Sequence, residues 1–398
     1  MRPICSPSGR CVRVEVDGEE RWGGIAGDEI VLSDGNRIPE ATAHYLAPAS
    51  PSKILAVHLT YGSRVREYDA RTPPEPSYFM KPPTTLNGHR QPVLMAKGAR
   101  FLNYEGELAV VIGTRMKGVP IDEVLDYVGG YTCANDVGMH DFRHADRGAM
   151  LRVKGHDGFL PLGPELVPGE QFDPTDYTLR TYLNGEVVQE ATADDLLFPV
   201  AYQLADLCRL ITLEPGDVVL TGTPANSRPM QPGDVVEVEI SGIGRLTNTI
   251  EEWDVDLAGP GEQMQISAQT LHVALAIPED EAEQMVAEGR EPCSGSTAST
   301  TSACASPTST RPRPAGRSSS RSSSGRARAV ERCSRATTSP TASSSWRAAR
   351  RGTTTSPSSS PSTARWTTRG RTSSRSTCAG RSAKARSSWT TPTAVRCS

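Results

Sequence analysis

The last quarter of the sequence lacks almost every residue type that a folded core needs. Residues 294–398 contain no Leu, Ile, Phe, Tyr, Met, Asp or Asn, and their only acidic residue is Glu331. Against that one acid stand 18 Arg and one Lys, so the segment has a formal charge of +18. Such a chain cannot bury enough apolar surface to offset the entropy lost on ordering. We therefore expect residues 294–398 to form a disordered Ser/Arg-rich tail.

Two interpretations of this tail differ in what they imply about partners. A genuine basic segment would bind nucleic acid through its phosphates. A GC-rich coding region translated in the wrong frame would also give mainly Arg, Ser, Thr, Ala and Pro. The tail has no Arg-Gly-Gly array, no interleaved aromatic residues and no repeat period, which favours the frame-shift product over a nucleic-acid-binding segment. Sequencing across codon 293 distinguishes the two.

The first 293 residues are also defined by absences. They contain no apolar run of 18 residues, so we expect no membrane span, and the N-terminus lacks the apolar core of a secretory signal. Cys5, Cys11, Cys133 and Cys208 form no Cys-x-x-Cys pair, which is typical of a reduced, cytoplasmic protein with structural thiols. This part carries 24 basic and 45 acidic residues, and its charge of −21 argues against nucleic-acid binding.

The pattern of apolar residues and turns predicts a mixed, β-rich α+β fold. Residues 1–50 read as a small N-terminal β module, residues 51–262 as the main domain, and residues 263–293 as a linker or short helix around 270–286. Asn184-Gly185 between two alternating runs predicts a β-hairpin. Many strands with few helices indicate a roll or barrel instead of a doubly wound sheet. The strands are expected at residues 12–16, 29–32, 53–58, 101–112, 177–183, 186–188, 217–221, 234–240 and 245–247, and helices at 122–127 and 196–210.

Two carboxylates stand at the head of the most apolar of these strands. Glu105 and Glu107 are two positions apart, so their side chains point to the same face of a strand, and Asp136 follows the next apolar run. Three neighbouring carboxylates resist joint ionisation unless a cation neutralises them. A hard divalent ion, Mg²⁺ or Mn²⁺, suits such oxygen ligands. The alternative is a strand with one solvent-exposed acidic face.

Residues 53–255 contain a series of short motifs. They are Tyr-Glu-Gly-Glu-Leu-Ala-Val-Val-Ile-Gly at 104–113, Asp-Tyr-Val-Gly-Gly-Tyr at 126–131, Ala-Asn-Asp-Val at 134–137, Arg-Val-Lys at 152–154, Asp-Gly-Phe at 157–159, Leu-Arg-Thr at 179–181, Asn-Gly-Glu at 184–186 and Thr-Gly-Thr-Pro at 221–224. With these motifs in this order, residues 53–255 resemble the fumarylacetoacetate hydrolase family. The resemblance implies the family's β-roll or barrel domain.

Within this family, residues 151–159, 179–186 and 192–198 are most similar to the bifunctional decarboxylase/isomerase of homoprotocatechuate (4-hydroxyphenylacetate) degradation. The resemblance implies a metal-dependent enzyme of aromatic catabolism that acts on a polycarboxylate 2-oxo or 2-hydroxy-dienoate. The substrate type is 5-oxopent-3-ene-1,2,5-tricarboxylate or 2-hydroxyhepta-2,4-diene-1,7-dioate, and the enzyme is expected to be a homodimer. A hydrolase of C–C bonds in acylpyruvates or fumarylacetoacetate is the first alternative, and a nucleic-acid-binding protein acting through the tail is the second.

The resemblance also implies roles for single residues. It assigns Glu105, Glu107 and Asp136 to the metal, Lys154 to a positive charge beside it, and Thr223 to a substrate carboxylate. A metal and an ammonium together would stabilise the enolate formed when a bond next to a keto group breaks. The alternatives are that Lys154 is an ordinary surface lysine and that Thr223 is a turn residue after a strand.

One position departs from the family. Many members carry a His and a Glu after the first strand to activate water, and here the His position is Arg64 while Glu67 remains. An arginine stays protonated and cannot act as a general base, but it binds carboxylates through two parallel hydrogen bonds. We therefore expect Arg64 to hold an extra substrate carboxylate, which favours decarboxylation or isomerisation over hydrolysis, with Glu67 as a proton shuttle. The alternative for Arg64 is a structural salt bridge.

A charge-dense stretch follows the third acidic ligand. Asp141 and Arg143 lie close enough in sequence to Asp136 to be substrate-binding candidates. His140, His144 or His156 is a candidate to replace the missing base. The alternative is a solvated loop without a role in catalysis.

A truncation tests the interpretation of the tail. Because residues 294–398 lack the apolar residues of a core, their removal should leave turnover unchanged. Steady-state kinetics of the full chain and of a chain ending at residue 293 measure this. A well-expressed truncated protein that loses most of its turnover would contradict the interpretation.

Overall fold

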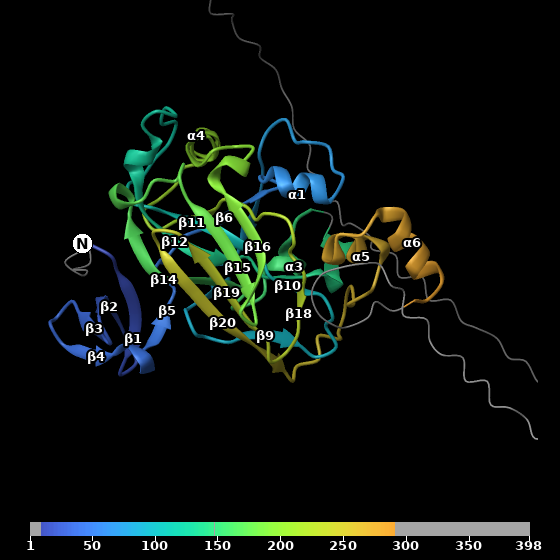
Figure 1. Cartoon of the computed structure of the whole chain (residues 1–398), viewed down its shortest axis with the longest axis horizontal. Helices are drawn as coiled ribbons and strands as arrows, with labels where there is room; N and C mark the ends of the chain where they lie inside the picture. The colour runs from blue at the N-terminus through green and yellow to red at the C-terminus, as the bar shows by residue number, and fades with distance from the viewer. Residues whose placement is uncertain (1–8, 147, 291–398) are drawn as a thin grey trace, which may run out of the picture. The chain divides into compact units, whose positions relative to one another are not determined.

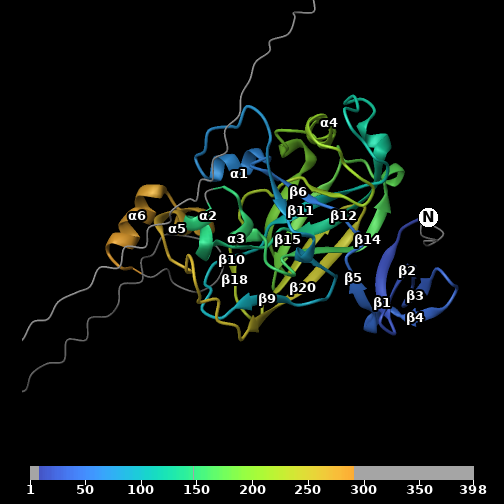
Figure 2. The same ribbon diagram turned by 180° about the vertical axis from the view of Figure 1, so that it is seen from behind.

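The computed structural model describes residues 9–146 and 148–290, which all belong to one compact unit (Figures 1 and 2). The tail at 294–398, predicted to be disordered, lies outside the described residues. Twenty strands and six α-helices are present in this part, and the mixed, strand-rich α+β architecture confirms the predicted fold class. No helix in the described ranges is long and apolar enough to cross a membrane.

The N-terminal residues form a separate antiparallel sheet. Its strand order is β4-β3-β2-β1-β5. Alternating apolar side chains of β1 and β3 pack with Tyr45 into a small core, as the sequence predicts for residues 12–16 and 29–32. The strands are β1 (Val12–Val16), β2 (Glu19–Ala26), β3 (Glu29–Leu32), β4 (Arg37–Pro39) and β5 (His44–Leu46).

A seven-stranded mixed sheet is the centre of the main domain. Its order is β7-β6-β17-β11-β12-β14-β8, and every residue of the central strand β11 is buried. A near-continuous Val/Ile/Leu run is typical of a strand covered on both faces. The strands are β6 (Ile54–His58), β7 (Ser77–Lys81), β8 (Leu86–Asn87), β11 (Gly106–Ile112), β12 (Val128–Asn135), β14 (Leu160–Pro168) and β17 (Val218–Leu220).

A five-stranded sheet packs against β11, β12 and β14. Its order is β16-β15-β19-β20-β9, and Asn184 and Gly185, both with positive φ, make the predicted turn between β15 and β16. A three-stranded sheet, β13-β10-β18, lies beside them. The bounds are β9 (Val93–Ala96), β10 (Leu102–Asn103), β13 (Gly138–Met139), β15 (Thr178–Leu183), β16 (Glu186–Thr192), β18 (Pro229–Met230), β19 (Val235–Ile240) and β20 (Gly244–Trp253).

The predicted strand at 101–112 is interrupted in the structure. β10 ends at Asn103 and β11 begins at Gly106, so Glu105 lies between two strands of different sheets. The reason is that the Glu105 amide donates to the side chain of Asn135 instead of to a neighbouring backbone carbonyl. This break turns the chain at the head of β11.

The helices are short, and two predicted ones begin later than expected. The predicted helix at 196–210 starts at Val200 because Pro199 precedes it with an extended backbone, and the predicted helix at 122–127 is a 3-10 turn at Val124–Tyr127. The α-helices are α1 (Gly62–Glu67), α2 (Arg143–Asp146), α3 (Leu151–Lys154), α4 (Val200–Leu210), α5 (Ala268–Leu275) and α6 (Glu279–Ala287).

The predicted helix at 270–286 is two helices. Ala276 adopts φ 51° and Pro278 caps α6, so the chain turns between α5 and α6. Both helices pack on Phe101, and α5 lies beside α2 and the 3-10 helix at His140–Phe142 (Figures 1 and 2). The side-chain amide of Asn103 donates to the Ala274 carbonyl at 2.9 Å, which ties α5 to β10. The domain boundaries expected at 50 and 262 stay predictions.

The cysteines only partly match the expectation of reduced thiols. Cys133 and Cys208 are free and buried, and burial raises the pKa of the Cys133 thiol to about 12. That thiol is therefore a core residue and not a nucleophile. The expectation is wrong for Cys11, which is disulfide-bonded.

The contribution of α5 to stability can be measured with one substitution. Leu271 is fully buried against Phe101, so Leu271→Ala should lower the free energy of unfolding by about 2–5 kcal/mol. Val286 on α6 is 43% exposed, and Val286→Ala should change the free energy of unfolding by less than about 0.5 kcal/mol. Urea denaturation compares the two variants. Equal stabilities would show that α5 does not pack on the domain.

Candidate active site

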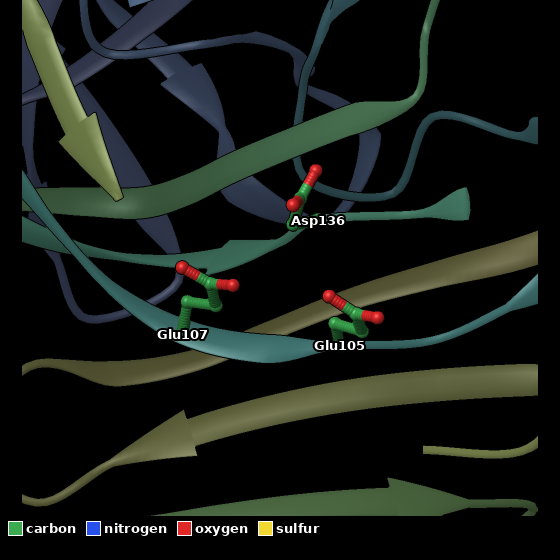
Figure 3. Close-up of side chains that lie close together, drawn as sticks. All are labelled: Glu105, Glu107 and Asp136. Carbon is green, nitrogen blue, oxygen red and sulfur yellow. The ribbon is translucent and has the colours of Figure 1, made fainter. Parts of the chain in front are cut away.

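The three predicted carboxylates converge. Glu105, Glu107 and Asp136 are all buried, and one ligand atom from each lies within 4.8 Å of the others. Figure 3 shows Glu105, just before β11, and Glu107, within β11, rising from the same side of the chain toward Asp136, which comes from the segment after β12. The pairing of Gly106 with Asn135 at the end of the β11–β12 ladder sets this approach. The predicted convergence is therefore present, although Glu105 precedes β11 instead of belonging to it.

Backbone and amide groups fix the carboxylates in place. The Asp136 amide donates to the Glu105 carbonyl at 2.8 Å, and the Gly222 amide donates to Oε2 of Glu107 at 2.7 Å. Gly222 has φ +98°, and a Cβ there would lie 1.8 Å from Oγ1 of Thr60, so only glycine brings this amide so close to the site. The Thr-Gly-Thr-Pro motif thus supplies an amide that orients the Glu107 carboxylate.

Two buried lysines balance the negative charge. Nζ of Lys154 lies 2.5 Å from Oε2 of Glu105 and 2.8 Å from Oδ2 of Asp136, as expected for a cation beside the acids. Lys81, at the end of β7, pairs with the other oxygen of Asp136 and donates to the Phe159 carbonyl at 3.0 Å. The sequence reasoning missed Lys81. The only indication of Lys81 in the sequence was its position as a charged residue at the end of a strand, beside an apolar segment.

Glu107 and Asp136 differ in the direction in which their surroundings shift the carboxyl pKa. Burial, together with the charges of Asp136 and Glu105, raises the pKa of Glu107 well above its ordinary value. Burial alone would also raise the pKa of Asp136, but the adjacent lysine ammonium groups lower it. An oxygen-only set of three carboxylates with residual mutual repulsion fits a hard divalent cation such as Mg²⁺ or Mn²⁺.

Arg64 lies at the edge of this cluster. It is buried in α1, its Nη1 donates to Glu67 at 2.8 Å, and its Nη2 lies 3.6 Å from Oε1 of Glu105. The guanidinium also stacks over the ring of Tyr68, with 4.4 Å to the centroid. The salt bridge offered as an alternative role exists, yet Nη2 also faces the carboxylates. Binding of substrate by Arg64 stays a prediction.

Glu67 is held by positive partners. Besides Arg64, Arg228 donates to it at 2.8 Å, and the Asn226 amide donates to both of its oxygens. These contacts hold the Glu67 side chain between α1 and the segment at 226–228. The proton-shuttle role of Glu67 therefore stays a prediction, with a structural role now evident beside it.

Thr223 is positioned by a residue that the sequence reasoning missed. Gln189 is buried, and its Nε2 donates to Oγ1 of Thr223 at 3.1 Å while its Oε1 accepts from the Gly106 amide at 3.1 Å. This side chain therefore ties the head of β11 to the Thr223 loop. Thr223 lies next to Gly222 and thus close to Glu107, and its contact with a substrate carboxylate stays a prediction.

Asp141 and Arg143, the two predicted substrate-binding residues, make different kinds of contact. Both oxygens of Asp141 accept backbone amides, from Arg100 at 3.0 Å and Phe101 at 2.9 Å, so this side chain fixes the segment that leads into β10. Arg143 is part-buried, donates to Sδ of Met150, and interacts electrostatically with Glu105. The predicted contacts of both residues with substrate remain predictions.

The three histidine candidates differ in their surroundings. His140 is buried with no hydrogen-bond partner for either ring nitrogen among the described residues. Nε2 of His144 lies 3.6 Å from Glu262, and His156 lies 2.7 Å from the Arg152 carbonyl and contacts Phe159. A fourth, His58, was missed. Burial, with the charges of Arg143 and Lys154, lowers its pKa to about 4.

The comparison with protein families agrees with the motifs. Residues 53–251 match the model "Fumarylacetoacetate (FAA) hydrolase C-terminal", which covers the carboxylates, both lysines and Thr223. The 4-hydroxyphenylacetate degradation bifunctional isomerase/decarboxylase of Escherichia coli is 39% identical over 215 residues. The match covers 53% of this chain and 50% of that protein, so the chain spans about half of this relative's length.

Solved structures share the fold. The 5-carboxymethyl-2-hydroxymuconate delta-isomerase of Mycobacterium smegmatis has a TM-score of 0.56 at 35% identity, covering 62% of this chain and all of that one. The 2-hydroxyhepta-2,4-diene-1,7-dioate isomerase of Mycobacterium marinum has a TM-score of 0.55 at 34% identity, covering 61% of this chain and 98% of that one. The matched motifs, the converging carboxylates and these likenesses together show that the chain belongs to the fumarylacetoacetate hydrolase family.

Proposed function

We propose that this protein is a divalent-metal-dependent decarboxylase/isomerase of aromatic catabolism. Its substrate would be a polycarboxylate 2-oxo or 2-hydroxy-dienoate of the 5-oxopent-3-ene-1,2,5-tricarboxylate or 2-hydroxyhepta-2,4-diene-1,7-dioate type. The names of the relatives in Escherichia coli and in the two mycobacteria support this class of substrate. A cytoplasmic homodimer that uses Mg²⁺ or Mn²⁺ completes the proposal.

The carboxylate cluster supports metal-assisted enolate chemistry. Glu105, Glu107 and Asp136 would hold the ion. When bound, such an ion would supply a Lewis acid for the keto and carboxylate oxygens of a 2-oxo acid. Lys154 is within reach of two of the ligands and would add a positive charge where the enolate oxygen develops.

The single observation that carries the proposal is the guanidinium at position 64. It brings a permanent positive charge within 3.6 Å of a carboxylate oxygen in the cluster, at the position where many family members have a base for water. Arg143 is a second guanidinium that interacts with Glu105. Two guanidinium groups suit a substrate with carboxylates beyond the chelating one. Hydrolysis of a C–C bond, the alternative, needs an activated water and therefore a base in place of Arg64.

Metal binding can be tested on one ligand. Loss of a group that only supports a metal ligand weakens binding roughly 10- to 100-fold, so Glu107→Gln, which removes a ligand, should weaken Mn²⁺ binding at least about 100-fold. Glu252 lies exposed on β20, and Glu252→Gln is the matched control that should bind as the unaltered chain does. Isothermal titration with Mn²⁺ and with Mg²⁺ measures both. Equal affinities in the two variants would reject the metal site.

The role of Arg64 is tested by removing its charge. If Arg64 holds a substrate carboxylate, Arg64→Ala should mainly raise KM for the tricarboxylate, with a loss of about 10- to 100-fold in kcat/KM. Ultraviolet assays with dienoate, tricarboxylate and acylpyruvate substrates, with and without Mg²⁺, measure the change. Arg66 lies on the same helix with its side chain exposed, and Arg66→Ala is the control.

The same assays distinguish the hydrolase alternative. Arg64→His restores the family's usual base beside Glu67 and should gain hydrolysis of acylpyruvates. Efficient acylpyruvate hydrolysis by the unaltered protein, with the tricarboxylate untouched, would instead make the protein a hydrolase.

A further inference from the structure

Isomerisation needs a group that accepts a proton from carbon, and the charged residues around the carboxylates do not suit this task. Arg64 cannot accept one, and Glu67 is held between Arg64 and Arg228. Lys154 is already paired with two carboxylates, Glu105 and Asp136. A base that is neutral at physiological pH must therefore come from elsewhere in the site.

His140 has the placement of such a base. It opens the 3-10 helix at His140–Phe142, directly after β13, and is 1% exposed with both ring nitrogens unpaired among the described residues. A buried polar group is normally hydrogen-bonded, so an unpaired imidazole in a folded protein calls for an explanation. A substrate atom or a bound water that completes its hydrogen bonds is one such explanation.

A glycine brings His140 next to Lys154. A Cβ on Gly138 would lie 3.3 Å from Cε of Lys154 and 3.5 Å from Nε2 of His140, so both side chains lie over the same open face of Gly138. Lys154 in turn contacts Glu105 and Asp136. The imidazole is therefore separated from the carboxylate cluster by a single side chain.

We propose that His140 is the proton-transfer residue of this active site. The inference rests on the proposed enolate chemistry. In isomerisation, the lone pair of Nε2 takes the proton from the carbon next to the keto group, and the C–H electron pair becomes the C=C bond of a dienolate whose charge lies on oxygen. The imidazolium then returns the same proton to the far carbon of the dienolate. Neutral imidazole is regenerated, and no other reactant is consumed.

The charges around His140 suit both halves of this transfer. Burial, and then the charges of Arg143, Lys154 and Arg64, hold the pKa of His140 well below its usual range. These surroundings therefore favour the neutral ring, which is the form that can accept a proton. The imidazolium is destabilised by the same cations, so it returns its proton readily once the negative dienolate has formed beside it.

The other histidine candidates lack this combination. The ring nitrogens of His144 also make no hydrogen bond within the described residues, but its Nε2 lies 3.6 Å from a carboxylate oxygen of Glu262, whereas no described carboxylate pairs with His140. His156 already lies 2.7 Å from the Arg152 carbonyl. His58 packs its ring on Phe79 with centroids 4.6 Å apart. His144→Gln is the matched control because it alters a part-buried imidazole in the adjoining helix α2.

Proton exchange tests the proposal separately from overall turnover. The full chain with Mg²⁺ is incubated with 2-oxoadipate in D₂O, and loss of the C3 proton signal is followed by NMR. His140→Gln should slow exchange by about 10²- to 10⁴-fold, and His144→Gln should leave it within about threefold. Mg²⁺ affinity and the unfolding midpoint of both variants should match those of the unaltered chain.

A second variant distinguishes a role in proton transfer from a structural effect of the substitution. His140→Ala opens space where the ring lay, and added imidazole should restore part of the exchange. Exchange at the original rate in His140→Gln, no rescue by imidazole, or no exchange by the unaltered chain would overturn the proposal. Exchange that depends on His140 without turnover of the dienoate would leave His140 as the base and reject the proposed substrate.

Discussion

The site depends on compensation of the repulsion between three buried carboxylates that lie close together. Glu105, Glu107 and Asp136 would not remain close and ionised without compensating charge. Lys154 and Lys81 supply that charge from two different elements, α3 and β7. The cluster therefore joins parts of the chain that are far apart in sequence, and its geometry is a property of the assembled domain.

The backbone around the cluster is irregular for the same reason. A regular ladder would have consumed the amides of Glu105 and Gly222, but these instead donate to Asn135 and Glu107. Gln189 accepts from the Gly106 amide on the other side of the same turn. Breaking one strand into β10 and β11 thus releases polar groups that hold the carboxylates, while the apolar body of β11 anchors the turn in the core.

Residues after the matched family region support the rim of the site. The carbonyl of Val273 in α5 accepts from the hydroxyl of Tyr68, whose ring lies under Arg64. Packing on Phe101 attaches α5 and α6 to the segment that Asp141 fixes. The His140 amide donates to the Phe101 carbonyl at 2.9 Å, so the rim and the proposed proton-transfer residue both connect to the cluster around Phe101. The stability of α5 is therefore related to the shape of the site.

The sequence by itself determined the fold class and the hairpin at Asn184, because these follow from local periodicity and turn chemistry. It also indicated that Glu105 and Glu107 converge, although the strand spacing behind that prediction holds only for Glu107, since Glu105 lies outside β11. The sequence also indicated that Arg64 cannot act as a base, since that depends only on the chemistry of the side chain.

The tertiary structure alone decided the pairing of Lys81 with Asp136, the hydrogen bonds of Gln189, and the different surroundings of the three histidines. His140, His144 and His156 look alike in sequence, and their differences come from what other elements bring against them. The break at Glu105 depended in the same way on a distant partner, Asn135. Long-range contacts set burial and charge balance, and local patterns of residues do not contain them.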